Sequence, residues 1–191
     1  MELCSNSIFV YIKNSRKYEG EINVRKKLII INGVMGVGKT TVAKSLYKSL
    51  EGSFWLDGDN VWEMNPFVVN EENKKMVLDN IGYILNSFLK NSSCKYVVFN
   101  WVIPTDEVME EILKRLDTND VQVYKFTLVC TKEELFKRIR KDVDLNLRDE
   151  GNFERSLKRY DLYKKMNTEK IDTTNKEIDY IVEFIKERTT N

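Results

Sequence analysis

The chain has 191 residues, and its 31 lysines and arginines nearly balance its 30 aspartates and glutamates, for a formal net charge of +1. This length can bury one substantial core, and the scarce, scattered glycines and prolines mark no linker, so we expect one compact enzyme domain. The balanced charge excludes a general attraction to nucleic acid or to an anionic membrane, and we expect neither as a partner.

The cysteines and the apolar segments indicate the compartment. Cys4, Cys94 and Cys130 are widely spaced and odd in number, which suits free thiols in a reducing cytoplasm better than disulfides or a zinc site. The apolar stretch 8–12 is short and followed by charges, so we do not expect a signal peptide, and no apolar run is long enough to span a bilayer. We expect a soluble cytoplasmic protein, either a monomer or a homodimer.

The first 26 residues stand apart from the pattern that follows. The segments 8–12 and 19–22 are compatible with a β-hairpin added to a sheet edge, and equally with a partly ordered tail. We therefore expect residues 1–26 to be an N-terminal extension or edge hairpin, and 27–191 to be the catalytic domain.

In residues 27–191, short β-branched or aromatic runs alternate with longer helical patterns. This alternation predicts an α/β fold, a three-layer sandwich in which helices cover both faces of a five-stranded, mainly parallel sheet. The expected strands are 28–32, 53–57, 96–100, 121–129 and 169–172. The expected helices are 40–50, 74–90, 106–116, 132–141, 153–166 and 176–188.

The first predicted strand runs into a glycine-rich segment, 33–40, that reads GVMGVGKT and fits the phosphate-binding pattern G-x-x-x-x-G-K-[ST]. Its glycines let successive amides curl around a triphosphate, and the helix that follows directs its positive end at the same anion. We expect Lys39 to reach the β- and γ-phosphates of ATP or GTP, and Thr40 to ligate Mg²⁺. The expected nucleotide-binding residues of this P-loop are Gly33, Val34, Met35, Gly36, Val37, Gly38, Lys39, Thr40 and Thr41.

The second predicted strand ends in two acids, Asp57 and Asp59, separated by Gly58. Ligands of open parallel sheets bind beyond the carboxyl ends of the strands, so these acids are candidates for chemistry, and a glycine between them suits a close approach to a ligand. The alternative is that the two carboxylates only cap a turn.

A P-loop followed by LDGDN at 56–60 resembles the P-loop small-molecule kinases, a group that includes nucleoside, nucleotide, adenylylsulfate, shikimate and gluconate kinases. The resemblance extends from about residue 27 to the end. It implies ATP-dependent transfer of a phosphoryl group to a hydroxyl or phosphate of a small molecule, with Asp57 holding Mg²⁺ through water and Asp59 taking the proton of the attacking hydroxyl. The chain has no histidine, so a carboxylate is the natural base.

The third predicted strand ends at Asn100 and Trp101, where many P-loop proteins carry an acid. Asn100 can orient a metal-bound water but cannot neutralise charge, which leaves more of the metal binding to Asp57. The equally weighted alternative is that both residues only end a strand and pack.

After the fourth predicted strand the chain is rich in arginine: Arg138, Arg140, Arg148, Arg155 and Arg159. The resemblance implies a mobile lid at about 140–160, with Arg138 stacking on adenine and Arg148 contacting the transferred phosphate. For the other three we favour ion pairs with nearby acids such as Asp142 or Asp161. Residues 171–175 resemble the loop that lines the adenine pocket.

The predicted acceptor-binding segment, 60–90, lies in a stretch from Lys26 through Lys114 without arginine. The resembled kinases of anionic acceptors bind them there with arginine. Aromatic faces are instead supplied by Trp55, Trp62, Phe67 and Trp101. We therefore expect a neutral or cationic acceptor such as a nucleoside, sugar or antibiotic. The alternative stays open that these aromatics are core and that lysines or lid arginines hold a phosphate.

Two other functions also stay open. A nucleotide-binding regulatory NTPase would need a partner surface and usually the acid that position 100 lacks. An antibiotic-modifying or zeta-toxin-like phosphotransferase would carry out the same reaction on a different acceptor.

Overall fold

The structure, a computed structural model, describes residues 25–190. Almost all of the expected hairpin or tail at 1–26 therefore lies outside the described residues, and the division of the chain at residue 27 stays a prediction. The first described strand already begins at Lys26.

Five strands form one sheet in the order β2-β3-β1-β4-β5. Every pair is parallel, so the described sheet is wholly parallel rather than mainly parallel. The strands are β1 (Lys26–Gly33), β2 (Ser53–Asp57), β3 (Tyr96–Asn100), β4 (Val121–Val129) and β5 (Glu169–Asp172). The expected strand positions are confirmed, and β1 is slightly longer than expected.

Six α-helices and one short 3-10 helix connect these strands within residues 25–190. They are α2 (Lys39–Ser49), η2 (Gly58–Val61), α3 (Glu71–Lys90), α4 (Asp106–Leu113), α5 (Lys132–Asp144), α6 (Asn152–Lys165) and α7 (Ile178–Thr190). The expected α-helices are all present. α3 begins before residue 74 because the side chain of Asn70 accepts a hydrogen bond from the amide of Asn73 at 2.8 Å, which caps the helix at 70.

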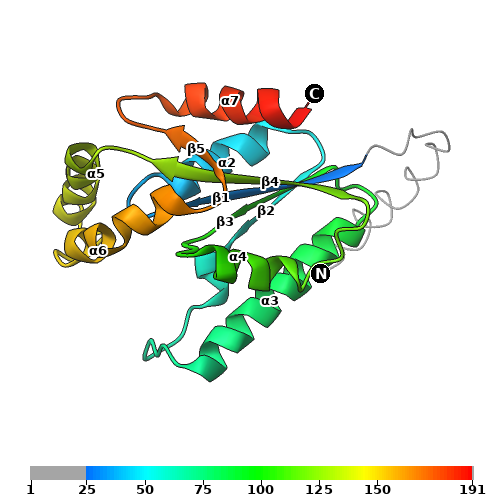
Figure 1. The fold of residues 1–191 in the computed structure, drawn as a ribbon, viewed down its shortest axis with the longest axis horizontal. Coiled ribbons are helices and arrows are strands. Elements are labelled where there is room, and N and C mark those ends of the chain that lie inside the picture. The colour runs from blue at the N-terminus through cyan, green and yellow to red at the C-terminus, as the bar shows by residue number, and fades with distance from the viewer. Residues whose placement is uncertain (1–24, 191) are drawn as a thin grey trace, which may run out of the picture.

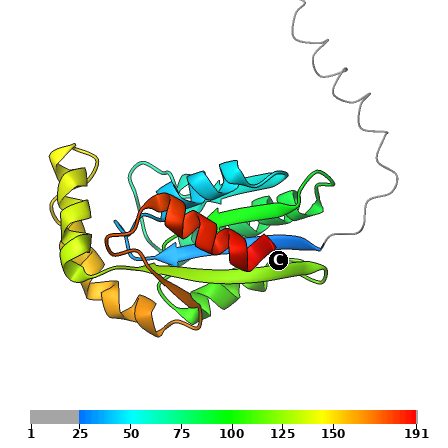
Figure 2. The same ribbon diagram turned by 90° about the horizontal axis from the view of Figure 1, so that it is seen from above.

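The helices cover both faces of the sheet, which confirms the predicted three-layer sandwich. α2 and α7 lie on one face, and α3 and α4 lie on the other (Figure 1). Residues 28–31 in the central strand β1 are fully buried, because a parallel sheet covered on both sides has no solvent-facing positions there. Figure 2 shows α7 lying across the sheet, with α5 and α6 beyond the edge where the strands end.

The strand register brings polar residues together at this carboxyl edge. Asp57, the last residue of β2, pairs with Asn100, the last residue of β3, and Asn100 also pairs with Ile31 of β1. The loop after β1 is the P-loop. The carboxyl ends of three neighbouring strands thus meet beside it.

Candidate active site

The P-loop joins β1 to α2, and α2 begins at Lys39. Gly36 and Gly38 have φ angles of 86° and 105°, a region that only glycine occupies readily. Gly38 caps α2 without a side-chain hydrogen bond, so no capping side chain competes for the amides of the first turn. The predicted nucleotide-binding residues 33–41 therefore form a glycine-rich loop followed by a helix N-terminus with free amides, an arrangement that can bind an anion.

Lys39 lies folded back over the loop and is 7% exposed. Its Nζ donates a hydrogen bond to the carbonyl oxygen of Val34 at 3.1 Å. Burial lowers the pKa of Lys39 to about 8, with the charges of Asp59 and Asp57 opposing that effect and that of Arg148 adding to it. The three residues predicted to be catalytic, Lys39, Asp59 and Arg148, are therefore near enough to act on one another electrostatically.

Thr40 and Asp57 form a cluster of oxygen atoms beside Lys39. The Thr40 hydroxyl donates to Asp57 Oδ2 at 2.8 Å, and Asn100 Nδ2 donates to Thr40 Oγ1 at 3.4 Å. Asn100 is 1% exposed and is itself held by Trp55, whose Nε1 donates to Asn100 Oδ1 at 2.7 Å. A hydroxyl and a carboxylate are the hard oxygen donors that Mg²⁺ prefers when phosphates supply further ligands. Both expected roles of Asn100 are thus compatible, because it packs and also contacts Thr40.

Asp59 lies in η2, the short 3-10 helix that begins directly after Asp57. Its amide donates to Asp57 Oδ1 at 3.1 Å, so Asp57 does cap a turn while its other oxygen faces Thr40. Burial raises the pKa of Asp59 and the charge of Asp57 adds to this, whereas Lys39, a hydrogen bond from the Trp101 side chain and Arg148 lower it. Asp59 retains solvent exposure, and its carboxylate lies near enough to Lys39 and Arg148 to feel their charges.

Gly58 makes this arrangement possible. A Cβ atom at position 58 would lie 2.4 Å from Cγ of Trp101, which is closer than any real contact allows. We expected the missing side chain at position 58 to leave room for a ligand. In the structure the indole ring of Trp101 fills that space.

Arg138 connects the P-loop to the loop after β5. Its guanidinium donates to the carbonyl oxygen of Val37 at 2.9 Å, to Thr173 Oγ1 at 2.9 Å, to the Thr173 carbonyl oxygen at 2.7 Å and to Glu134 Oε1 at 2.8 Å. These contacts use the edge of the guanidinium, so only its faces stay available for the expected stacking on adenine. The side chain is 26% exposed.

Arg148 lies between α5 and α6, where its Nε donates to Asp142 Oδ2 at 2.8 Å. Asp142 was expected as a partner of the other three arginines, two of which instead use different acids. Those pairs are Arg140–Asp144 and Arg155–Asp149, and all four side chains are more than half exposed. The ion-pair interpretation of Arg140 and Arg155 is therefore confirmed, with corrected partners.

Helix α6 is attached to the P-loop and to β4 by two hydroxyl groups. Ser156 Oγ donates to the carbonyl oxygen of Met35 at 3.2 Å, and Tyr160 Oη donates to the carbonyl oxygen of Cys130 at 2.5 Å. The part of the expected lid that α6 forms is thus docked on the site in this structure.

Three of the four expected aromatic residues form one wall next to Asp59. The Trp62 ring lies 5.4 Å from the Phe67 ring and 6.3 Å from the Trp101 ring. Trp55 is different, because its ring stacks on Tyr47 at 5.4 Å and packs β2 against α2. The core alternative therefore holds for Trp55, and also for Trp101, which is 8% exposed and belongs to the buried core.

Two of the three lysines of the acceptor segment are paired with acids, and the third, Lys90, ends α3. Lys74 pairs with Glu71 and Lys75 pairs with Asp79, both along the exposed surface of α3 at 2.8 Å. A hollow of about 250 Å³ between η2 and α3 has Glu63 as its one charged lining residue. The described acceptor segment therefore presents more aromatic and acidic surface than free positive charge.

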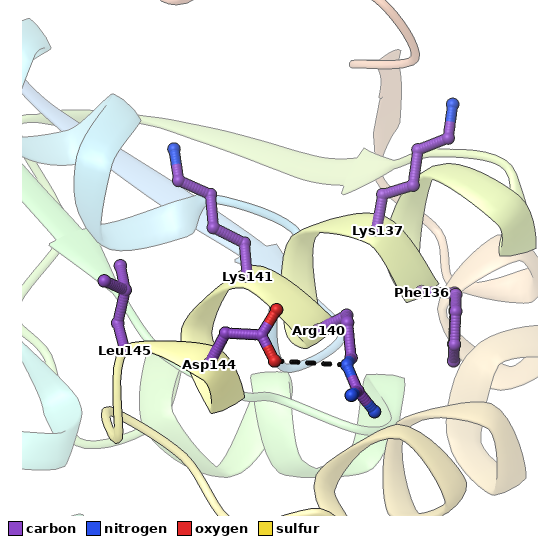
Figure 3. Close-up of a pocket in the computed structure, with 6 residues that line it drawn as sticks. All are labelled: Phe136, Lys137, Arg140, Lys141, Asp144 and Leu145. Carbon is purple, nitrogen blue, oxygen red and sulfur yellow. Dashed lines mark ion pairs between the residues drawn. The ribbon is translucent and has the colours of Figure 1, made fainter.

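A larger hollow of about 410 Å³ lies away from this site (Figure 3). Its lining consists of Phe136, Lys137, Arg140, Lys141, Asp144 and Leu145. All belong to α5 or directly follow it, and Arg140 pairs with Asp144 across it at 3.2 Å. It is a surface groove along one helix and includes none of the predicted site residues.

The sequence profile of the family described as AAA domain matches residues 29–176. The chain belongs to this family. Shikimate kinases from two strains of Bacillus anthracis are 27% identical to it over 172 residues, which cover 85% of this chain and 98% of theirs. These matches confirm the nucleotide-binding P-loop class that the motif predicted.

Solved structures show the same fold. The tunicamycin resistance protein of Deinococcus radiodurans aligns with a TM-score of 0.64 at 22% identity, over 86% of this chain and 95% of that one. A gluconokinase from Sinorhizobium meliloti aligns with a TM-score of 0.61 at 14% identity, over 84% and 89%. These structures confirm the predicted fold of the P-loop small-molecule kinases, and the shikimate kinase relatives support the predicted kinase-type phosphotransfer. Within residues 25–190, no helix has both the length and the apolar composition that a bilayer crossing requires.

Sequence reasoning missed two contributors to the site. The charge of Asp59 acts on the phenol of Tyr163 in α6, and the ring of Trp101 packs against Gly58, next to Asp59. Trp101 was named as a possible aromatic face and as a residue that ends a strand, but not as a neighbour of Gly58. The signal for Tyr163 was its spacing from Ser156 and Tyr160, which places all three on one face of α6.

Proposed function

We propose that this chain transfers the γ-phosphate of ATP to a hydroxyl group of a neutral or cationic small molecule. The observation that carries the proposal is the position of Asp59, whose carboxylate lies within electrostatic range of Lys39 and Arg148 and follows Gly58, which packs on the ring of Trp101. A carboxylate between phosphate-binding cations and an aromatic wall is arranged for proton transfer from an acceptor hydroxyl.

The phosphates of ATP would occupy the P-loop. The amides of residues 34–41 would bind the β- and γ-phosphates, and Lys39 would exchange its contact with Val34 for a phosphate oxygen. Arg148 would exchange Asp142 for the transferred phosphate and thereby stabilise the charge on it in the transition state. The faces of the Arg138 guanidinium would stack on adenine.

Thr40 and Asp57 would hold Mg²⁺, and their 2.8 Å contact already brings two suitable oxygen atoms together. When bound, the ion neutralises charge on the phosphates. Asp57 would act through water, since it also caps η2, and Asn100 would orient such a water.

Asp59 would accept the proton of the attacking hydroxyl. As that oxygen bonds to the γ-phosphorus, the bond from the γ-phosphorus to the bridging oxygen breaks and ADP leaves with the electron pair. α6, docked on the P-loop through Ser156, would help exclude the water that competes as a nucleophile.

The acceptor class follows from the charges near Asp59. Residues 60–90 contain no arginine, and Lys74 and Lys75 are paired on the outer surface of α3. Anionic acceptors would lack cationic partners from this segment, whereas the wall of Trp62, Phe67 and Trp101 suits a ring with little charge. We also propose that the protein acts in the cytoplasm as a monomer or homodimer.

An antibiotic acceptor is the second candidate, because the fold matches that of a tunicamycin resistance protein over 86% of this chain. The chemistry at Asp59 would be the same. A regulatory NTPase is less favoured, because it would need neither a carboxylate at position 59 near Lys39 and Arg148 nor the aromatic wall beside it.

The test is to incubate the protein with ATP and Mg²⁺ and with single members of a panel of nucleosides, neutral sugars, aminoglycosides, tunicamycin, nucleoside monophosphates and shikimate. We expect ADP formation above the acceptor-free background with a neutral or cationic member, and its phosphorylated product in the mass spectrum. Background rates with every compound would favour the regulatory NTPase. Turnover with the anionic members alone would contradict the acceptor class.

A further inference from the structure

Four side chains beside the P-loop form a hydrogen-bond series that joins α2, β2 and β3. Trp55 and Asp57 lie two residues apart in β2, so their side chains leave the same face of the sheet, and Asn100 of β3 is the register partner of Asp57. Helix α2 brings Thr40 against Asp57 and Asn100. The series runs Trp55–Asn100–Thr40–Asp57, with contacts of 2.7, 3.4 and 2.8 Å.

Trp55 sets the direction of this series. An indole N–H can only donate, so the atom that lies 2.7 Å from its Nε1 has to be the oxygen of the Asn100 amide and not the nitrogen. The two ends of an asparagine amide have nearly the same size, so shape alone would not choose between them. With its oxygen held by Trp55, Asn100 presents its NH₂ group to Thr40.

The NH₂ group of Asn100 in turn decides where the Thr40 hydroxyl hydrogen points. A hydroxyl has one hydrogen, and towards an NH₂ group it can only accept. The hydrogen therefore goes to Asp57 Oδ2, 2.8 Å away, because an ionised carboxylate can only accept. With the amide reversed, the oxygen of Asn100 and that of Asp57 would compete for the same hydrogen.

The position of this hydrogen matters for Mg²⁺. Thr40 Oγ1 can ligate the ion only through a lone pair, so its hydrogen has to point elsewhere. With the hydrogen on Asp57 and a long contact of 3.4 Å from Asn100, Oγ1 keeps a lone pair for the metal. Thr40 is partly exposed, whereas Asn100 is 1% exposed and acts only through its neighbours.

Trp55 is itself held by α2. Its ring stacks on that of Tyr47 at 5.4 Å with an interplanar angle of 10°, and Lys44 Nζ lies 5.3 Å from the ring centroid. Lys44 and Tyr47 are three residues apart and lie on one face of the helix whose first turn carries Thr40. The same helix thus carries the hydroxyl and fixes the indole that orients it.

We propose that Trp55 is a positioning residue for the metal, which holds the amide of Asn100 with its NH₂ group toward Thr40 and so keeps a lone pair of Thr40 Oγ1 available to Mg²⁺. This inference rests on the proposed function, because it concerns the metal ligands of that same site. It also assigns a use to the uncharged residue at position 100. Asn100 orients the hydroxyl without placing a second carboxylate beside Asp57.

Trp55→Phe provides the first test, because it keeps a ring against Tyr47 but removes the N–H. The amide of Asn100 is then free to turn its oxygen to Thr40. ATP binding is measured by calorimetry without an acceptor, once at a fixed Mg²⁺ concentration and once in EDTA. We expect the gain in ATP affinity that Mg²⁺ gives to fall about threefold to tenfold, the size of one lost hydrogen bond. Affinity in EDTA should be unchanged, because the P-loop and Lys39 are intact.

Trp62→Phe is the matched control for this substitution. It also replaces an indole by a phenyl ring, but the Nε1 of Trp62 has no hydrogen-bond partner within residues 25–190. We expect this variant to keep the full gain in ATP affinity from Mg²⁺.

A double variant separates the orientation of the amide from the packing of Trp55. In Trp55→Phe combined with Asn100→Leu, leucine has nearly the shape of asparagine but no oxygen, so nothing competes with Asp57 for the Thr40 hydrogen. We expect the gain from Mg²⁺ to return to within about twofold of the wild type. The melting temperature should lie above that of Trp55→Phe alone, which leaves the buried oxygen of Asn100 without its donor.

Three results would overturn the inference. The first is a gain from Mg²⁺ in Trp55→Phe equal to that of the wild type, or the lack of any gain in the wild type. The second is an equal loss in Trp62→Phe. The third is an equal loss in the double variant, which would trace the effect to packing. Failure of the phosphotransfer proposal is recognised separately, by background ADP formation with every acceptor, since these binding measurements need none.

Discussion

The two halves of the site are built in opposite ways. The nucleotide half is built mainly from one continuous segment, 33–41, with a lysine, glycines and a free helix start, to which Arg138 and Arg148 are added from later in the chain. The acceptor half is assembled from η2, Trp62 with Phe67, the residue after β3 and one face of α6. A phosphate group is always the same, so a local motif suffices to bind it, whereas an acceptor of particular shape needs side chains from several elements.

The two halves also differ in charge. Lys39, Arg138 and Arg148 surround the proposed phosphate and adenine positions, while the acceptor half contains aromatic rings and two donors without partners among residues 25–190. Substitutions in the first half should therefore act on nucleotide turnover with any acceptor. Substitutions in the second half should leave nucleotide binding unchanged.

The largest effect is expected from Lys39→Ala. This change removes the ammonium that the P-loop holds at the phosphates, so ATP turnover should be abolished with every acceptor. ADP release measured in a coupled assay tests this. The matched control is Lys44→Ala, which removes a lysine of the same helix whose ammonium lies 5.3 Å from the Trp55 ring centroid and which should retain activity. Wild-type turnover in Lys39→Ala would contradict the site assignment.

Asp59→Asn should have very different effects on phosphoryl transfer and on ATP binding. The amide keeps the shape of the carboxylate but cannot take a proton, so phosphoryl transfer should fall by about two to four orders of magnitude while ATP affinity stays near normal. Single-turnover rates and calorimetric ATP binding measure both. Asp57→Asn is the comparison, since it should weaken the Mg²⁺ dependence as well. Loss of ATP affinity in Asp59→Asn would assign Asp59 to the metal or to the structure.

The pH dependence of binding should differ between the halves. Burial lowers the pKa of Lys39 to about 8, and ATP binds the charged form, so ATP affinity in EDTA should fall by up to about tenfold per pH unit above 8. Below the pKa the affinity should be constant. Lys39→Arg keeps its charge and should lose this dependence. Binding of a neutral probe such as uridine should not change over the same range, because the wall of Trp62, Phe67 and Trp101 carries no ionisable side chain.

The smallest effect is expected from Gly58→Ala. The added methyl group would displace the Trp101 ring, so the KM of the acceptor should rise several-fold and the protein should lose about 1–3 kcal/mol of stability. ATP affinity should not change. Gly82→Ala is the matched control, because its Cβ would lie 2.9 Å from Cβ of Arg115 rather than against the aromatic wall, and should cost stability alone. Equal effects of both changes on the acceptor would argue against a role for Trp101 there.

Much of the fold could be predicted because its strands and helices leave patterns in short stretches of sequence. A buried parallel strand gives a short apolar run, and β2 to β5 have the predicted bounds. Helix starts were predictable where a capping side chain precedes acids, as at Thr105 before α4. The start of α3 was misplaced because its cap, Asn70, follows a segment without clear periodicity.

Predictions of which side chains contact one another succeeded less often. Asp142 pairs with Arg148, Gly58 makes room for Trp101, and Trp55 packs against α2. Each outcome depends on which side chain another element brings near. Spacing along one segment carries no information about that.

The amino-acid sequence by itself determined the P-loop, the order of strands and helices and the presence of a carboxylate pair after β2, because each depends on neighbours along the chain. Only the tertiary structure decided that Asp59 faces Lys39, that Trp62, Phe67 and Trp101 form one wall and that Tyr163 has no hydrogen-bond partner. The physical reason is that these relations arise from packing between segments far apart in the chain, where burial and register select the contacts.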